Sequence, residues 1–237
     1  MLFIVQIRAA LSVERQLTRQ PTRACNVFLG LLPKVFCMAC VKSLKALPPA
    51  TREAALSLVT RNFCQFEPLS HHLGIKEQHL RSYVSHVASL GEEHSIVVER
   101  DRNILAVALC EEILPHSQTV APSLPGGDAI LEILEEVGHG FLEGLLQQGR
   151  VLHVAMVATD HNYAGRGYCK LLLEACLQLA TEQQFKYVVA EATAPGSQAA
   201  FSHFNFSVLN EIPYKGFCDS FGSLSGSVKF VCKTLKC

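Results

Sequence analysis

The sequence contains no tryptophan, only 3 methionines and no excess charge of either sign, because 21 lysines and arginines balance 21 aspartates and glutamates. A chain without net charge has no electrostatic basis for binding nucleic acid or an acidic membrane surface. It also has no apolar run near the roughly 20 residues that a membrane-spanning helix needs. We therefore expect neither a nucleic-acid partner nor a membrane partner.

Paired cysteine motifs are scarce as well. Among 10 cysteines, only Cys37 and Cys40 have the C-x-x-C spacing, and no second pair completes a zinc site. Other cysteines stand in apolar patterns, where cysteine behaves as a small hydrophobic residue. These are Cys64, Cys110, Cys169, Cys176 and Cys232. We predict no metal site and a reduced, intracellular protein.

What the chain does have is apolar content: 49% of its 237 residues are hydrophobic and 18% are charged, which is typical of a well-buried globular protein. Residues 1–33 differ, because four arginines stand there against the single acid Glu14. Such a segment is either a mitochondrial presequence or an added helix or loose arm. We divide the chain into an N-terminal extension, 1–33, and one domain, 34–237. We expect a cytoplasmic protein, with mitochondrial targeting as the alternative.

Strand and helix patterns follow one another along residues 34–237. A helix is expected to begin at Thr51 and to end at Glu67-Pro68, because a residue before proline is displaced from helical geometry. Strands are expected at 35–44, 95–99, 104–109, 151–157, 186–191, 206–209 and 228–234, and further helices at 76–90, 130–148, 169–181 and 197–203. This order predicts an α/β fold with one mixed central sheet of about seven strands flanked by helices.

A glycine-containing turn joins the strand at 151–157 to the helix that follows it. Gly165, Arg166 and Gly167 stand in this turn. A strand-to-helix turn of this kind leaves backbone N–H groups free at the positive end of the helix dipole, where phosphate commonly binds; a plain tight turn is the alternative. A Walker loop is excluded, because Leu171 follows Lys170. A dinucleotide fingerprint is excluded, because Lys170 stands where its third glycine belongs.

The segment Ala164-Gly-Arg-Gly-Tyr-Cys169 resembles the pyrophosphate-binding turn Q/R-x-x-G-x-G/A of the GNAT superfamily of acetyl-CoA-dependent N-acetyltransferases. Ala164 and Cys169 depart from that pattern. Residues 197–206 resemble the family's fourth helix and closing Gly-Phe, with Asn205 in place of the glycine. Residues 63–69 and the helix at 130–148 resemble the insect-type arylalkylamine N-acetyltransferases. The resemblance implies that the fourth and fifth strands splay apart.

The resemblance also implies which residues form the site. Glu67 would act as general base, and a backbone N–H of Met156 or Val157 would stabilise the developing oxyanion. A solvated glutamate at a helix end is the alternative for Glu67. Acetyl-CoA would be bound through the fourth strand and the turn, by Met156, Val157, Ala158, Thr159, Gly165, Arg166, Gly167, Tyr168, Cys169 and Lys170.

Protonation of the leaving thiolate is less well defined by the resemblance. Many family members use a tyrosine where this chain has Phe201, which carries no acidic proton. Ser197 and Thr193 are the hydroxyl candidates, although a serine at a helix start is also a common N-cap. His71 and His72 either line the acceptor pocket or are solvated, and His203 is expected on a helix surface.

Three functions remain open at this point. The first is acetyl transfer from acetyl-CoA to the primary amine of a small molecule, arylalkylamine-like, by direct attack with general-base assistance. The second is acetylation of a polyamine or a protein N-terminus. The third is a non-catalytic acyl-CoA-binding module. We expect a monomer whose partners are the amine and acetyl-CoA.

The composition of residues 1–33 leads to a first prediction. Deleting them should leave the free energies of unfolding and of acetyl-CoA binding within about 1 kcal/mol of the full chain, because few core contacts would be lost. Denaturant unfolding and calorimetry measure the two quantities. A larger loss of stability would mean that the segment packs into the domain.

Overall fold

A computed structural model describes residues 39–114 and 123–236 of the chain. The expected N-terminal extension, residues 1–33, lies outside these ranges, and so do residues 35–38 of the expected first strand and much of the loop before the helix at 130–148. The division at residue 33 therefore stays a prediction.

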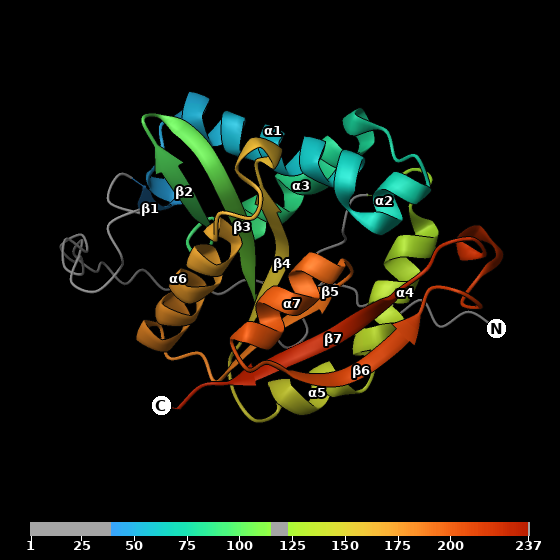
Figure 1. The fold of residues 1–237 in the computed structure, drawn as a ribbon. Coiled ribbons are helices and arrows are strands. Elements are labelled where there is room, and N and C mark those ends of the chain that lie inside the picture. The colour runs from blue at the N-terminus through green and yellow to red at the C-terminus, as the bar shows by residue number, and fades with distance from the viewer. Residues whose placement is uncertain (1–38, 115–122, 237) are drawn as a thin grey trace, which may run out of the picture.

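The described strands form one seven-stranded sheet in the order β1-β2-β3-β4-β5-β7-β6 (Figure 1). β4 and β5 pair in parallel, and every other neighbouring pair is antiparallel. The mixed central sheet of about seven strands is confirmed. The strands are β1 Cys40–Ser43, β2 Ile96–Arg100, β3 Asn103–Ile113, β4 Val151–Thr159, β5 Tyr187–Ala192, β6 Ser207–Pro213 and β7 Ser227–Thr234.

Helices cover both faces of this sheet, and a separate hydrophobic core lies under each layer (Figure 1). One core includes residues of α1, α2, α3 and α4, and the other includes residues of α6 and α7. The helices are α1 Pro49–Phe66, α2 Pro68–His72, α3 Glu77–Leu90, α4 Asp128–Gly138, α5 Phe141–Leu146, α6 Tyr168–Glu182 and α7 Pro195–His203.

Three helix boundaries differ from the sequence-based expectation. α1 begins at Pro49, so Thr51 lies inside its first turn and does not cap it. α7 begins at Pro195, which places Ser197 at the third helical position. The single helix expected at 130–148 is two helices, because Gly140 has φ 78°, a left-handed conformation that an α-helix cannot continue through.

The splaying of β4 from β5 is also confirmed. The two strands pair only at Val151↔Tyr187, Leu152↔Val188 and His153↔Val189, although β4 continues to Thr159 and β5 to Ala192. The register between β3 and β4 shifts just beyond this point, because Leu109 faces Met156 while Cys110 faces Val154. Ala155 is thus an extra residue, a β-bulge that reverses which side chains of β4 face each core.

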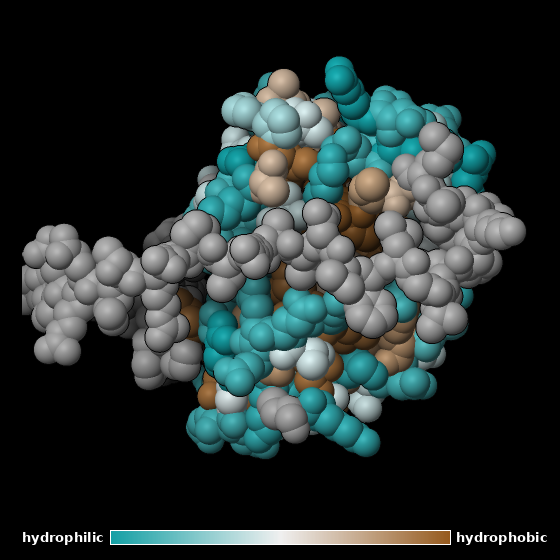
Figure 2. Space-filling model, turned by 90° about the vertical axis from the view of Figure 1, so that its left-hand side faces the viewer, coloured by the Kyte–Doolittle hydropathy of each residue, from teal (hydrophilic) through white to brown (hydrophobic). Residues whose placement is uncertain are grey.

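No helix among the described residues combines the length and apolar character needed to cross a bilayer. The face shown in Figure 2 is mainly hydrophilic over its described residues, and the hydrophobic residues exposed there occupy smaller areas.

Gly91 fixes the connection between α3 and β2 against β3. A β-carbon at this position would lie 1.5 Å from the carbonyl oxygen of Cys110 and 2.5 Å from its carbonyl carbon. Ser95 secures the same contact, because its Oγ donates to the Gly91 carbonyl oxygen at 2.8 Å and accepts from the Cys110 N–H at 3.1 Å. Only glycine permits this approach of two backbone segments.

We therefore predict that Gly91→Ala lowers the free energy of unfolding by at least about 3 kcal/mol, because backbone atoms must move to admit the methyl group. The matched control is Gly144→Ala in α5, where no atom lies within 4 Å of the added β-carbon. That control should change stability by less than about 1 kcal/mol. Urea unfolding of the two variants measures the difference, and equal stabilities would contradict the assigned role of Gly91.

Candidate active site

Glu67 lies at the junction of α1 and α2, where Pro68 prevents one continuous helix. Its backbone is extended, with φ −74° and ψ 125°, and its side chain caps α2. The Leu69 N–H donates to Glu67 Oε1 at 3.1 Å, and the Ser70 N–H donates to Oε2 at 2.7 Å. The residue is only 9% exposed. Glu67 is thus a buried and oriented carboxyl group, not a solvated glutamate at a helix end.

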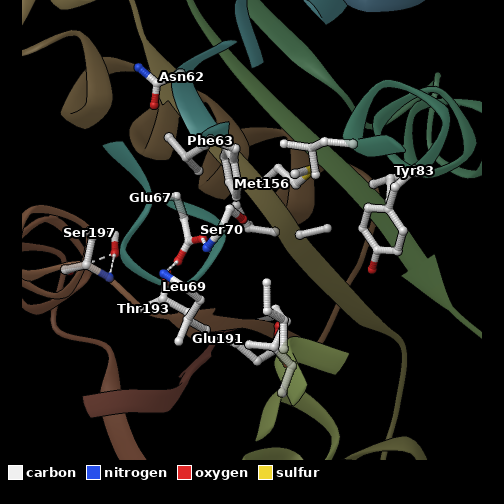
Figure 3. A pocket seen from close by; sticks show the side chains of 18 of the residues that line it. Asn62, Phe63, Glu67, Leu69, Ser70, Tyr83, Met156, Glu191, Thr193 and Ser197 are labelled. Carbon is white, nitrogen blue, oxygen red and sulfur yellow. Dashed lines mark hydrogen bonds between the residues drawn. The ribbon is translucent and has the colours of Figure 1, made fainter. Parts of the chain in front are cut away.

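Thr193 and Ser197 line the same cavity as this carboxylate (Figure 3). The hydroxyl of the buried Tyr214 donates to the Thr193 carbonyl oxygen. Burial, and after it the charge of Glu67, raises the pKa of Tyr214 above its ordinary value. Ser197 Oγ donates to the Ala194 carbonyl oxygen at 2.9 Å and accepts from the Ala194 N–H at 3.3 Å. Its hydroxyl therefore already stabilises the start of α7.

The glycine turn before α6 has the backbone that a phosphate site requires. Gly165 has φ 72° and Gly167 has φ 85°, both in the left-handed region. Gly167 is the N-cap of α6, and no side chain forms a capping hydrogen bond there. A β-carbon at Gly165 would meet no atom within 4 Å. The N–H groups of Cys169 and Lys170, in the first turn of this 15-residue helix, are thus available to a ligand.

Charged side chains border the turn. The Arg166 guanidinium lies 5.2 Å from the centre of the Tyr163 ring, and that of Arg100 lies 5.3 Å from the same ring. Arg166 and Lys170 are exposed. Both can contribute positive charge toward an anion at the turn.

A cavity of about 320 Å³ runs through the opening between β4 and β5. Its walls come from both helical layers and from the two strands that separate (Figure 3). Its lining includes the expected residues Glu67, Met156, Val157, Thr159, Cys169, Thr193 and Ser197. One cavity is thus lined by the predicted general base, by the two predicted hydroxyl residues and by the β4 residues expected to contact acetyl-CoA.

The remaining expected residues lie outside the cavity lining. Ala158 and Tyr168 are 2% and 6% exposed, so their side chains belong to the cores. Gly165, Arg166, Gly167 and Lys170 belong to the turn. Burial raises the pKa of the Cys169 thiol to about 11, so it contributes to the wall as a neutral group.

The same cavity is also lined by a group of three polar residues that the sequence did not reveal. The group consists of Glu111 on β3, His153 on β4 and Glu191 on β5. His153 Nδ1 lies 3.1 Å from Glu111 Oε1, and Nε2 lies 2.6 Å from Glu191 Oε2. The available signal was a charged or titratable residue within each of three otherwise apolar strands, since such residues are rarely buried unless paired.

His153 is positively charged in this arrangement. Burial by itself would lower the pKa of His153, but the charge of Glu191, the hydrogen bonds to Glu111 and Glu191 and the charge of Glu111 outweigh burial and raise it to about 10. Both ring nitrogens donate to carboxylates, so neither has a lone pair for a metal. No cluster of three or more possible metal ligands occurs within the ranges 39–114 and 123–236.

The other histidines considered from the sequence do not line this cavity. His71 Nδ1 lies 3.3 Å from the Cys64 carbonyl oxygen, and His72 Nε2 lies 2.9 Å from that of Ser220. His203 is exposed and packs edge-on against Phe204, as expected of a helix surface residue.

Residues 62–206 match the model of the acetyltransferase (GNAT) family. The match covers more than half of the 237 residues. The chain belongs to the GNAT family. It is therefore an acyltransferase that depends on acetyl-CoA. No curated protein matches the sequence significantly.

Solved structures of other acetyltransferases share this GNAT fold. A yellow fever mosquito (Aedes aegypti) protein assigned as arylalkylamine N-acetyltransferase 7 superposes with a TM-score of 0.72 at 19% identity, over 83% of this chain and 87% of that one. Arylalkylamine N-acetyltransferase 2 of Aedes aegypti gives 0.68 at 18% identity, over 84% and 99%. A polyamine N-acetyltransferase of Drosophila melanogaster gives 0.62 at 16% identity, over 83% and 100%.

The local backbone fits the GNAT assignment at Asn205, one of the positions that depart from the family pattern. Asn205 has φ 57°, so it occupies the left-handed conformation that the usual glycine would adopt, and asparagine tolerates this conformation better than most residues. The turn itself retains two left-handed glycines and an uncapped helix start, the features that allow a backbone to approach the pyrophosphate of acetyl-CoA.

The turn leads to a third prediction. Gly167→Val should raise the Kd for acetyl-CoA at least tenfold, about 1.4 kcal/mol, because the bulky side chain would prevent the backbone from approaching the pyrophosphate. Calorimetry on the folded variant measures this. The control is Gly140→Val, which places the same side chain at φ 78° away from the turn. Unchanged affinity in Gly167→Val would remove the turn from the acetyl-CoA site.

Proposed function

We propose that this protein transfers an acetyl group from acetyl-CoA to the primary amine of a small molecule, with Glu67 as general base. The observation that carries the proposal is a buried, oriented carboxylate that lines the same cavity as the strand β4 and Cys169 of α6. The apolar wall of that cavity, which includes Phe63, Leu80, Leu134 and Met156, suits an alkyl or aryl body on the amine.

Glu67 would remove a proton from the attacking amine. A primary alkylamine has a pKa of about 10.4, so keeping it neutral at pH 7 costs roughly 4.6 kcal/mol without a base. Each Glu67 oxygen accepts one backbone N–H. A carboxylate oxygen can accept more than one hydrogen bond, so the capping bonds orient Glu67 and leave it able to accept the amine proton.

Acetyl-CoA supplies the activated acyl group when it is bound. Gly165, Arg166, Gly167 and Lys170 would hold its pyrophosphate, and β4 between Met156 and Thr159 would lie alongside its pantetheine arm. The backbone N–H groups of β4 that have no partner on β5 would stabilise negative charge on the reacting carbonyl oxygen. These contacts mainly position the reactants.

The amine nitrogen forms a bond to the acyl carbon, and the carbon–sulfur bond breaks. The proton removed from nitrogen passes to Glu67, and the sulfur needs a proton to leave as a thiol. Ser197 Oγ lines the cavity and is our first candidate for giving that proton, with Thr193 as the second. Its existing bond to the Ala194 carbonyl oxygen would have to be exchanged for one to the sulfur.

The fourth prediction tests Glu67. Glu67→Gln keeps the shape of the side chain and removes its basicity, so kcat/KM should fall about 10²- to 10⁴-fold. Acetyl-CoA affinity should change little, because the turn at α6 is untouched. Raising the pH should partly restore turnover, since more of the amine is then already neutral. Thiol release from acetyl-CoA with a panel of amines measures the rates.

The matched control is Glu77→Gln, which removes the same charge from an exposed glutamate in the first turn of α3. It should retain full turnover. Normal kcat/KM in Glu67→Gln at neutral pH would exclude Glu67 as base. Acetyl-CoA binding by the wild type without thiol release on any amine would favour the non-catalytic acyl-CoA-binding module.

A further inference from the structure

The cavity continues well beyond the reacting groups. Along β4 it is lined from His153 to Thr159, six residues apart, which at about 3.3 Å per residue corresponds to roughly 20 Å of strand. Asn62 Nδ2 donates to the Thr159 carbonyl oxygen at 2.8 Å, so the Thr159 part lies beside α1. The His153 part lies where β4 and β5 still pair. An acceptor can thus extend from Glu67 toward His153.

Glu111, His153 and Glu191 form the polar end of this cavity, which we call the distal group. His153 binds one oxygen of each carboxylate. Glu111 Oε2 and Glu191 Oε1 have no hydrogen-bond partner within the part of the chain that the structure describes. The group sets two acidic side chains against one basic side chain. It therefore offers two hydrogen-bond acceptors and an excess of acidic over basic groups.

Around the distal group lie a tyrosine, further glutamates and one more histidine, His139. Tyr83 lines the same cavity, and burial, followed by the charges of Glu111 and Glu191, raises its pKa, so it is present as a neutral hydroxyl. A second cavity, of about 520 Å³, shares all three residues of the distal group with the first. Three further glutamates line it: Glu112, Glu135 and Glu143. Of these, Glu112 is paired with Arg150.

We propose that the distal group binds a second cationic group of the acceptor, so that the preferred substrates are diamines or aminoguanidines. This inference rests on the proposed acetyltransferase function and specifies its substrate class. One end of the acceptor, the amine to be acetylated, would lie at Glu67. The other end, an ammonium or guanidinium, would donate to Glu111 Oε2 and Glu191 Oε1.

The spacing of the two ends suits a short acceptor. Glu191 precedes Thr193 by two residues, about 7 Å of extended chain. Thr193 and Glu191 both line the cavity that Glu67 lines. An alkyl chain of about four or five carbons spans a comparable distance. The apolar wall between the two ends suits its methylene groups.

The test compares acceptors of matched length in wild type and in Glu191→Gln. The acceptors are 1-aminobutane, 1,4-diaminobutane, 4-guanidinobutylamine, 2-phenylethylamine and tyramine. We expect kcat/KM for the two dications to exceed that for 1-aminobutane at least tenfold in the wild type. Glu191→Gln should lower the ratio of dication to monoamine kcat/KM at least tenfold, a ratio that a general loss of structure would leave unchanged. Glu111→Gln provides a second, independent variant.

The control is Glu136→Gln, which removes the same charge from an exposed glutamate of α4 that lines neither cavity. It should leave the ratio of dication to monoamine kcat/KM unchanged. Calorimetric Kd values for 1,4-diaminobutane and 1-aminobutane supply a measurement that does not depend on turnover. The two proposals can fail separately. If the wild type binds 1,4-diaminobutane, Glu191→Gln binds it more weakly, and no thiol is released with any amine, the distal site is upheld and the proposed function is contradicted.

Two other outcomes would overturn the distal site while leaving the acetyltransferase intact. The first is turnover of monoamines and dications with equal kcat/KM. The second is that Glu191→Gln lowers kcat/KM for tyramine alone. The distal group would then bind a hydroxyl group of the acceptor and not a second cation. A wild type that shows neither turnover nor preferential dication binding would contradict both proposals.

Discussion

The separation of β4 from β5 after His153 is the constraint on which the rest of the site depends. Two parallel strands inside a sheet normally continue to pair, because unpaired backbone N–H and C=O groups are costly when buried. Here pairing stops after three residue pairs, and the opened edges line a cavity instead. A ligand with hydrogen-bonding groups can satisfy these edges, so the opening in the sheet suits the binding of the substrates that we propose.

His153 stands where the separation begins. It is the last β4 residue that pairs with β5, where its partner is Val189. On the other side it pairs with Glu111 of β3, and its ring contacts the carboxylates of Glu111 and Glu191. Three strands are thus joined by one imidazolium at the base of the opening. A buried charge left without its partner is strongly destabilising, so this arrangement holds the three strands in a defined register.

Much of the fold could be predicted because its signals are local. The glycine turn, the helix after it and the break at Glu67-Pro68 each depend on a few adjacent residues, and all of them are found where expected. The distal group could not be predicted, because Glu111, His153 and Glu191 belong to three strands. The bulge at Ala155 added to the difficulty. Side chains of a regular strand alternate between the two faces of the sheet, and the bulge reverses this alternation within β4.

Glu67 illustrates how one residue can meet a structural and a chemical demand together. Pro68 ends α1 and removes a donor from the start of α2, so the next two N–H groups need an acceptor, and the Glu67 carboxylate provides it. The same bonds prevent the carboxylate from turning toward solvent. A carboxyl group fixed in this way needs no further side chain to orient it, so the rest of the cavity wall can be largely apolar, as the proposed acceptor requires.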